Sequence, residues 1–206
     1  MRIVKLNECA DKVLFEIDRF RSNERGKLIN LNLIDVSESA DFGGRNIILG
    51  NSEKTKDSLK EFAKHFYGLR KSICLIMFNK NFDIEFFENA VLSGFSKESV
   101  LLVGAENLSG TEISFLSENK IRRVNLGVFL EDIFDACDVV MEFSSGKQLF
   151  LLFDFSVLDS VSPGGLSMGQ VVYILSRMGL MKNLDCVYFS GVLEEKKLAK
   201  LVSEVL

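Results

Sequence analysis

Short apolar runs rich in β-branched residues alternate along this chain with segments of helical periodicity, and this alternation restricts the folds that are open to it. The runs are predicted strands, and they lie at residues 27–36, 46–50, 72–78, 99–105, 139–144, 148–154 and 185–191. Runs that lack an alternating polar face are typical of strands buried on both sides of a parallel sheet. Strands that alternate with helices predict an α/β protein, a three-layer α/β/α sandwich with a mainly parallel sheet.

The helical segments each have one apolar face. The spacing i, i+3, i+4, i+7 recurs at Leu59, Phe62, Ala63 and Phe66, at Val171, Ile174, Leu175 and Met178, and at Leu198, Leu201, Val202 and Val205. Lys and Glu lie opposite the apolar residues of the last segment, as expected for a helix that covers a sheet and faces water on its other side.

Length and composition indicate a packed protein. The 206 residues suit one substantial core, so we expect a single domain over residues 1–206. Hydrophobic residues make up 47% and charged residues 26%, which excludes a disordered chain.

The net charge of −4 and the scattered basic residues argue against a nucleic-acid partner. No stretch approaches the roughly 18 apolar residues of a membrane span, so we expect no membrane association and a cytoplasmic location.

The cysteines are far apart in the sequence. Cys9, Cys74, Cys137 and Cys186 form no CxxC pair, and Cys74 and Cys186 lie within apolar predicted strands. We therefore expect reduced, buried thiols and a reducing compartment.

Polar residues follow three of the predicted strands, in the segments GNSEK, NKNFD and DFSVLD. In a parallel sheet the carboxyl ends of the strands meet at one edge, where ligand sites gather. The side chains that could supply oxygen ligands to a cation are Glu53, Asn79, Asn81, Asp83, Asp154, Ser156 and Asp159. The same residue types are also ordinary loop and helix-cap residues, so a purely structural role stays open.

The order and spacing of these segments resemble those of the arginase and agmatinase family of ureohydrolases. That family has the strand-end motifs GGDH, DAHxD and DxDxxDP, followed by PGGL. The segment DFSVLDSVSPGGLSMGQ is similar to a shortened third motif with the helix after it, with Asp154, Asp159 and the PGGL stretch in register. IILGNSEKTKDSL and CLIMFNKNFDI resemble the first two motifs. The resemblance is strongest over residues 45–190 and implies an arginase-like fold.

Most of the residues that bind metal in that family are replaced in this chain. The resemblance implies a binuclear manganese centre that activates a hydroxide for attack on a guanidinium carbon. Its ligand positions fall on Glu53, Asn79, Asn81, Asp83, Asp154 and Ser156. Two imidazoles and two carboxylates are thereby lost. Two divalent cations bring four positive charges together, and the remaining carboxylates offset them poorly.

What remains resembles a site for one cation at most. Glu53, Asp83 and Asp154 with Asn79 form a residual set of ligands for one manganese or magnesium ion, since hard cations accept such oxygens. The second metal position retains only amide, hydroxyl and shared carboxylate oxygens, and we expect it to be empty. The acidic residue that holds the guanidinium group in the family falls at Gln170, whose neutral amide loses that charge-assisted contact.

These replacements predict a ureohydrolase-fold protein that has lost the binuclear manganese centre and guanidino hydrolysis. We expect no catalytic residue and no cofactor, and a role as a binding or assembly subunit, either as a homo-oligomer or beside a partner subunit. The alternative is a metal-dependent hydrolase of a guanidino or amide substrate that uses a reduced site with one manganese or magnesium ion. A third possibility is a stand-alone α/β domain whose likeness to the motifs is accidental.

Other chemistries have weaker support in the sequence. His65, the only histidine, lies on a helical pattern rather than at a predicted strand end, which argues against a general acid there. A cysteine nucleophile would need a histidine close by. Neither a GxSxG motif nor a P-loop occurs.

Two local expectations follow from the segments at the strand ends. The amide groups of Asn79 and Asn81 are expected to donate hydrogen bonds to the neighbouring carboxylates, since an amide NH₂ is a donor where the family's acid is not. Gly164 and Gly165 are expected to permit a tight turn, and Ser167 is expected to cap the helix that follows.

Overall fold

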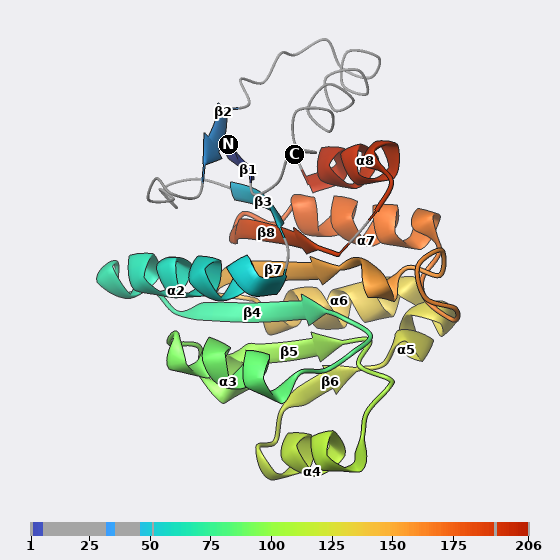
Figure 1. The fold of residues 1–206 in the computed structure, drawn as a ribbon, viewed down its shortest axis with the longest axis horizontal. Coiled ribbons are helices and arrows are strands. Elements are labelled where there is room, and N and C mark those ends of the chain that lie inside the picture. The colour runs from blue at the N-terminus through green and yellow to red at the C-terminus, as the bar shows by residue number, and fades with distance from the viewer. Residues whose placement is uncertain (1, 6–31, 36–45, 51, 192, 206) are drawn as a thin grey trace.

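The computed structural model of this chain describes residues 2–5, 32–35, 46–50, 52–191 and 193–205. Its strands form one eight-stranded sheet in the order β2-β1-β3-β8-β7-β4-β5-β6, and the neighbouring strands are parallel (Figure 1). The strands are β1 Arg2–Lys5, β2 Asn32–Asp35, β3 Asn46–Gly50, β4 Ile73–Phe78, β5 Val100–Val103, β6 Arg122–Val124, β7 Gln148–Asp154 and β8 Leu184–Ser190. The helices are α2 Ser52–Gly68, α3 Ile84–Leu92, α4 Gly110–Glu118, α5 Leu126–Glu131, α6 Ile133–Phe143, α7 Met168–Gly179 and α8 Glu195–Val205.

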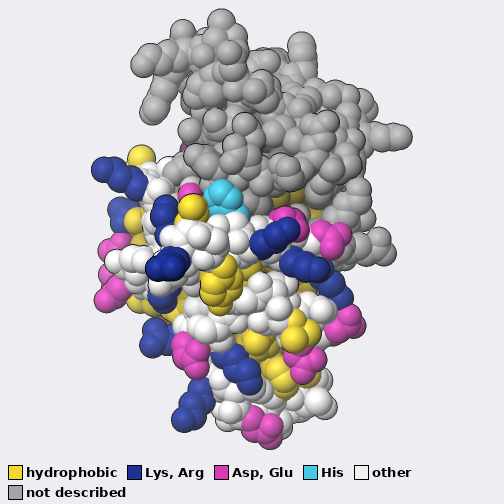
Figure 2. All heavy atoms as spheres, turned by 90° about the vertical axis from the view of Figure 1, so that its left-hand side faces the viewer, with side chains coloured by type: hydrophobic (Ala, Val, Ile, Leu, Met, Phe, Trp, Pro, Cys, Tyr) yellow, Lys and Arg dark blue, Asp and Glu magenta, His cyan; other side chains and the backbone are white. Residues whose placement is uncertain are grey.

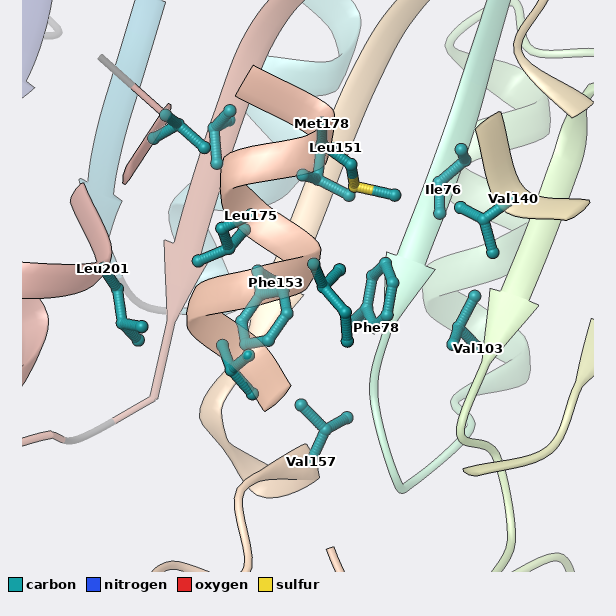
Figure 3. Close-up of a cluster of buried hydrophobic side chains, with 14 of the residues drawn as sticks. Ile76, Phe78, Val103, Val140, Leu151, Phe153, Val157, Leu175, Met178 and Leu201 are labelled. Carbon is teal, nitrogen blue, oxygen red and sulfur yellow. The ribbon is translucent and has the colours of Figure 1, made fainter. Parts of the chain in front are cut away.

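Helices cover both faces of the sheet and enclose it between two apolar clusters. Residues of α2, α3 and α4 belong to one cluster, and residues of α5, α6, α7 and α8 belong to the other (Figure 1). In β7, Leu151 and Phe153 point into the second cluster, while Phe150 and Leu152 point into the first. Figure 3 shows the second cluster, in which the rings of Phe78 and Phe153 are stacked 5.1 Å apart. The predicted three-layer α/β/α sandwich with a parallel sheet is confirmed.

The three predicted helical patterns are confirmed as α2, α7 and α8. Their apolar positions are buried, except that Leu198 in α8 is half-buried. His65 lies in the last turn of α2, as predicted, with its ring 4.8 Å from that of Phe66. None of the described helices is long and apolar enough to cross a membrane.

The predicted strand at residues 139–144 is wrong, because these residues form the end of α6 and the residue after it. Asp132 caps this helix by accepting hydrogen bonds from the backbone N–H groups of Phe134 and Asp135. The buried residues of the helix recur at helical spacing and are Ala136, Cys137, Val140 and Phe143. The run VVMEFS is too short to show the helical spacing of these buried residues, because a short apolar run fits a strand or a buried helix equally well.

The apolar pattern does not predict β1 or β6. β1 lies between β2 and β3, and β6 forms one edge of the sheet beside β5. Both arginines of β6, Arg122 and Arg123, are exposed, so the strand lacks the apolar run that marks a central strand. Charged side chains are common on edge strands because they discourage pairing with other chains.

Cys74 and Cys186 are free and buried, as predicted, and so is Cys137, while Cys9 lies outside the described residues. Burial raises the pKa of the Cys74 thiol from 9.0 to about 12 and the pKa of Cys137 to about 11. It also raises the pKa of Cys186 well above its ordinary value. These thiols are therefore held in their neutral form and have little nucleophilic character.

The raised pKa values predict a loss of stability at alkaline pH. Tyr188 is buried as well, and burial raises its pKa from 10.0 to about 12. Above about pH 9 the unfolded chain releases these protons while the folded chain keeps them, so the free energy of unfolding falls as the pH rises toward 12. Denaturant unfolding at a series of alkaline pH values measures this fall. Cys74→Ala is expected to make it shallower, and an unfolding free energy that stays constant to about pH 11 would contradict the assignment.

Candidate functional site

The strand ends that carry the predicted site residues lie at the same edge of the sheet. β4 and β7 are adjacent, with Phe78 opposite Phe153, so the segments that begin at Asn79 and Asp154 leave the sheet side by side. β7 and β8 are also adjacent, with Asp154 opposite Ser190. The arrowheads of these strands point to the right in Figure 1. The first turn of α2, which contains Glu53, follows β3 at this edge, but the Glu53 side chain lies outside the described residues.

A network of hydrogen bonds connects the segments that follow β4, β7 and β8. Asp154 Oδ1 accepts from the backbone N–H of Ser156 at 2.8 Å, and Asp154 Oδ2 accepts from the hydroxyl of Ser190. The Ser156 hydroxyl donates to Asn79 Oδ1 at 3.1 Å and accepts from the backbone N–H of Lys80 at 3.1 Å. Asn79 Oδ1 also accepts from the backbone N–H of Asn81 at 2.9 Å. Asn79, Asp154 and Ser156, three of the replaced or residual ligand positions, are thus in one cluster.

The direction of the hydrogen bonds differs from the prediction for the two asparagines. Asn79 contributes its amide oxygen as an acceptor, rather than its NH₂ group as a donor to a carboxylate. Asn81 is exposed and contributes its backbone N–H. Asp83 is also exposed and lies at the N-cap of α3, where its side chain makes no capping hydrogen bond. Asn79 Oδ1 instead meets two donors: the Asn81 N–H, two residues along the chain as in an Asx turn, and the Ser156 hydroxyl, 77 positions away, which local sequence does not place.

Lys80 lies between the two asparagines and is buried, with 5% of its surface exposed. Its ammonium group donates to the backbone carbonyl oxygen of Ser162 at 3.5 Å and to that of Pro163. A buried charge is costly unless hydrogen bonds compensate it, and here main-chain carbonyls of the PGGL segment do so. The sequence contained a signal for this residue, since lysine stands where the family's DAHxD motif has alanine. Lys80 is not itself at a ligand position, so the ligand motif alone does not identify it.

The PGGL segment forms the tight turn that its glycines predict. Gly164 has a φ of +75°, and its N–H donates to Asp159 Oδ1 at 2.9 Å. Gly165 packs directly on the chain that leaves β7, because a Cβ atom there would lie 2.4 Å from the carbonyl oxygen of Val157. Leu166 pairs with Leu158 as an isolated bridge beside this contact. The segment is therefore joined both to the end of β7 and to Lys80.

Gln170, the position of the family's guanidinium-binding acid, takes part in the cap of α7. Ser167 is the N-cap, as predicted, and its hydroxyl accepts from the Gln170 N–H at 3.3 Å. The Gln170 side-chain oxygen in turn accepts from the Ser167 N–H at 2.9 Å. This reciprocal capping box engages the side-chain oxygen of Gln170 with the helix terminus.

The described donors do not fit a pair of divalent cations. Among the residues that the structure describes, no three His, Cys, Asp or Glu side chains gather in a group that could hold a metal ion. Asn79 Oδ1 accepts two hydrogen bonds and each oxygen of Asp154 accepts one, and the Lys80 ammonium donates to the carbonyls of Ser162 and Pro163. Two metal ions need several anionic oxygens or imidazoles that are free to coordinate.

Comparisons with known proteins identify the fold. No family model matches the sequence, and no curated protein matches it by sequence. Solved structures do match: arginase from Bacillus cereus with a TM-score of 0.77 and 14% identity, over 99% of this chain and 96% of that one. Arginase from Entamoeba histolytica in complex with L-ornithine has a TM-score of 0.76 and 12% identity, over 99% and 97% of the two chains. Formiminoglutamase from Trypanosoma cruzi, with manganese, has a TM-score of 0.72 and 15% identity, over 99% and 88%.

These likenesses span nearly the whole chain. They show that it has the arginase fold, which in this chain is a parallel sheet between two layers of helices. At 12 to 15% identity these likenesses establish the fold, whereas the chemistry depends on this chain's own residues.

Proposed function

We propose that this chain is an arginase-fold protein that neither assembles a binuclear manganese centre nor hydrolyses guanidino compounds, and that it acts as a binding or assembly subunit. The observation that carries the proposal is the buried ammonium of Lys80, which lies in the segment between two replaced ligand positions and donates to the carbonyls of Ser162 and Pro163. The ammonium group of Lys80 is thus a permanent positive charge in the segment that carries metal ligands in the family.

The hydrogen bonds around Lys80 favour a closed strand-end site. Asn79 Oδ1 accepts from two donors, which uses both of its lone pairs, so metal binding at this oxygen would have to break one of these hydrogen bonds. Each oxygen of Asp154 accepts from one donor only and keeps a lone pair. Each such hydrogen bond contributes about 0.5 to 1.5 kcal/mol. The network and the lysine together stabilise the metal-free arrangement.

The role as a subunit rests on the retained scaffold. The PGGL turn and the capping box of α7 keep the framework of the fold while the groups needed for hydrolysis are replaced. We propose one arginase-like domain over residues 1–206, which pairs with a second copy or with another subunit. A cytoplasmic location is proposed too, and the free, buried thiols of Cys74, Cys137 and Cys186 support a reducing compartment.

The purified protein is expected to release no urea from arginine or agmatine in the presence of manganese. It is also expected to unfold at the same temperature with manganese as with a chelator, because metal binding that favours the folded state would raise that temperature. Colorimetric urea assays and calorimetry measure the two quantities. One bound ion per chain, together with turnover of a guanidino or amide substrate that Asp154→Ala abolishes, would support the single-cation hydrolase instead.

The positive control is a variant that restores the lost ligand types, with Asn79→Asp, Asn81→His and Ser156→Asp combined. Side chains at 79 and 156 are in contact, so two acids there repel each other by on the order of 1 kcal/mol or more in chelator. Manganese is expected to recover this loss. Asn125→Asp, at the exposed N-cap of α5, adds a charge outside the network and is expected to respond to neither condition. A triple variant that ignores manganese would contradict the assignment of these positions.

A further inference from the structure

A groove of about 550 Å³ lies along the edge strand β6 and extends to the side of the sheet at which β5, β6 and β7 begin. Leu101 near the start of β5, Arg122 at the start of β6 and Lys147 just before β7 contribute to its lining. This side of the sheet faces the viewer in Figure 2, where Lys and Arg side chains border hydrophobic ones. The lining extends from Arg122 at the start of β6 to Val124 at its end, and β5 lies between this edge strand and β4, whose end carries Asn79. The volume of the groove is typical of pockets that bind small molecules.

The groove combines an apolar floor with cationic walls. Val124 and Val139 supply accessible apolar surface above the buried side chains of Leu101 and Phe143. Arg122, Arg123 and Lys147 supply positive charge. Glu142 is the one acid among the described residues that line it. The positive charges therefore outnumber the negative in a chain whose overall net charge is −4.

Two of the cations are held in place against the aromatic ring at the floor. The Lys147 ammonium lies 4.5 Å from the centroid of the Phe143 ring and donates to the Phe143 carbonyl oxygen at 3.0 Å. The Arg122 guanidinium carbon lies 5.8 Å from the same centroid. Contacts of this kind orient a cation without neutralising its charge. Within the described part of the chain, no acidic side chain forms an ion pair with Arg122, Arg123 or Lys147.

We propose that this groove binds a small organic anion, one that carries a carboxylate or phosphate group on an apolar or aromatic body. The anionic group would receive charge-assisted hydrogen bonds from Arg122, Arg123 and Lys147. The apolar body would cover Val139, which is 52% exposed, and the half-buried Val124, which inorganic phosphate cannot do. A guanidino compound is a cation and is repelled by the same charges. The groove would therefore select a different class of ligand from the guanidino compounds that the likeness to arginase suggests for the carboxyl ends of the strands.

A matched set of probes separates the charge of the ligand from its apolar body. Calorimetric titration at low salt would compare 2-naphthyl phosphate and 2-naphthoate, which carry both features, with inorganic phosphate and with neutral 2-naphthol. One naphthyl anion or both are expected to bind saturably to one site per chain, and the stronger of the two identifies phosphate or carboxylate as the preferred group. Phosphate alone and 2-naphthol are expected to bind at least about tenfold more weakly, since each lacks one half of the interaction.

Substitutions locate the binding. Arg122→Gln and Lys147→Gln keep part of the side-chain stem over Phe143 and are each expected to weaken naphthyl anion binding about tenfold. Lys182→Gln, at an exposed position just before β8, removes a charge outside the groove and is expected to leave binding unchanged. Circular dichroism checks that each variant is folded. Equal binding of 2-naphthol, no binding of either anion, or binding that survives both groove substitutions would overturn the proposal.

Discussion

Replacing Phe153 with alanine is expected to lower the free energy of unfolding by about 3 to 5 kcal/mol. Phe153 lies in β7 between β4 and β8 and is 0% exposed. Its ring is stacked on Phe78 with centroids 5.1 Å apart, and it also contacts the rings of Phe155 and Phe189. The substitution removes these contacts and leaves a cavity that a central strand cannot close by moving. Urea unfolding followed by circular dichroism measures the loss.

A matched control for this substitution is Phe134→Ala. Phe134 is 62% exposed and its main aromatic contact is an edge-to-face approach to Tyr173, with centroids 5.1 Å apart. Its loss is expected to cost less than about 1.5 kcal/mol, because an exposed ring that is removed leaves no cavity. Similar losses for the two variants would show that the cluster around β7 is not the main core of the protein.

Gly165→Ala is the second substitution with a large expected effect, about 1 to 3 kcal/mol or more of unfolding free energy. The added Cβ would lie 2.4 Å from the Val157 carbonyl oxygen and 2.7 Å from the Asp159 backbone nitrogen. These atoms belong to the main chain and are held by hydrogen bonds with Leu166, at 2.7 Å and 2.9 Å. The methyl group therefore has no flexible neighbour to displace, and the segment after β7 must move as a whole.

The control lies four residues further along the chain. A Cβ at Gly169, in the first turn of α7, would meet only the Ser167 hydroxyl oxygen, at 4.0 Å. Gly169→Ala is expected to be neutral or to stabilise the protein by up to about 1 kcal/mol, since alanine restricts the unfolded chain. Thermal and urea unfolding of both variants make the comparison. If Gly165→Ala were as stable as Gly169→Ala, the close packing of the PGGL segment on β7 would be wrong.

Manganese titration of the Gly165→Ala protein would also separate structure from chemistry at the strand ends. The proposed role of Lys80 requires the carbonyls of Ser162 and Pro163 to stay where the turn holds them. A loosened turn would weaken these hydrogen bonds without supplying a single metal ligand, so stability falls while manganese still has no effect. This result would support a structural role of the PGGL segment, and recovery of stability with manganese would contradict it.

Local patterns in the sequence were sufficient for the class of fold. Apolar spacing identified α2, α7 and α8, because one face of each helix must be buried against the sheet. Ser167 and Gly164 were found for a similar reason, since capping and a positive φ depend on residues close in sequence. The alternation of strands and helices led to the parallel three-layer sandwich, because crossovers between parallel strands need helices.

Contacts between distant segments could not be obtained in this way. The Asn79 oxygen accepts from Ser156, 77 positions away, and Lys80 reaches the carbonyl of Pro163, 83 positions away. The exposed arginines of β6 line a groove together with Leu101 of β5, the end of α6 and the residues before β7, and these segments are far apart in the sequence. Side-chain type restricts what each of these residues can do, but the partner that it meets depends on the order of strands in the sheet. That order arises from the packing of the whole chain, which brings β4 next to β7 and leaves β6 at the edge.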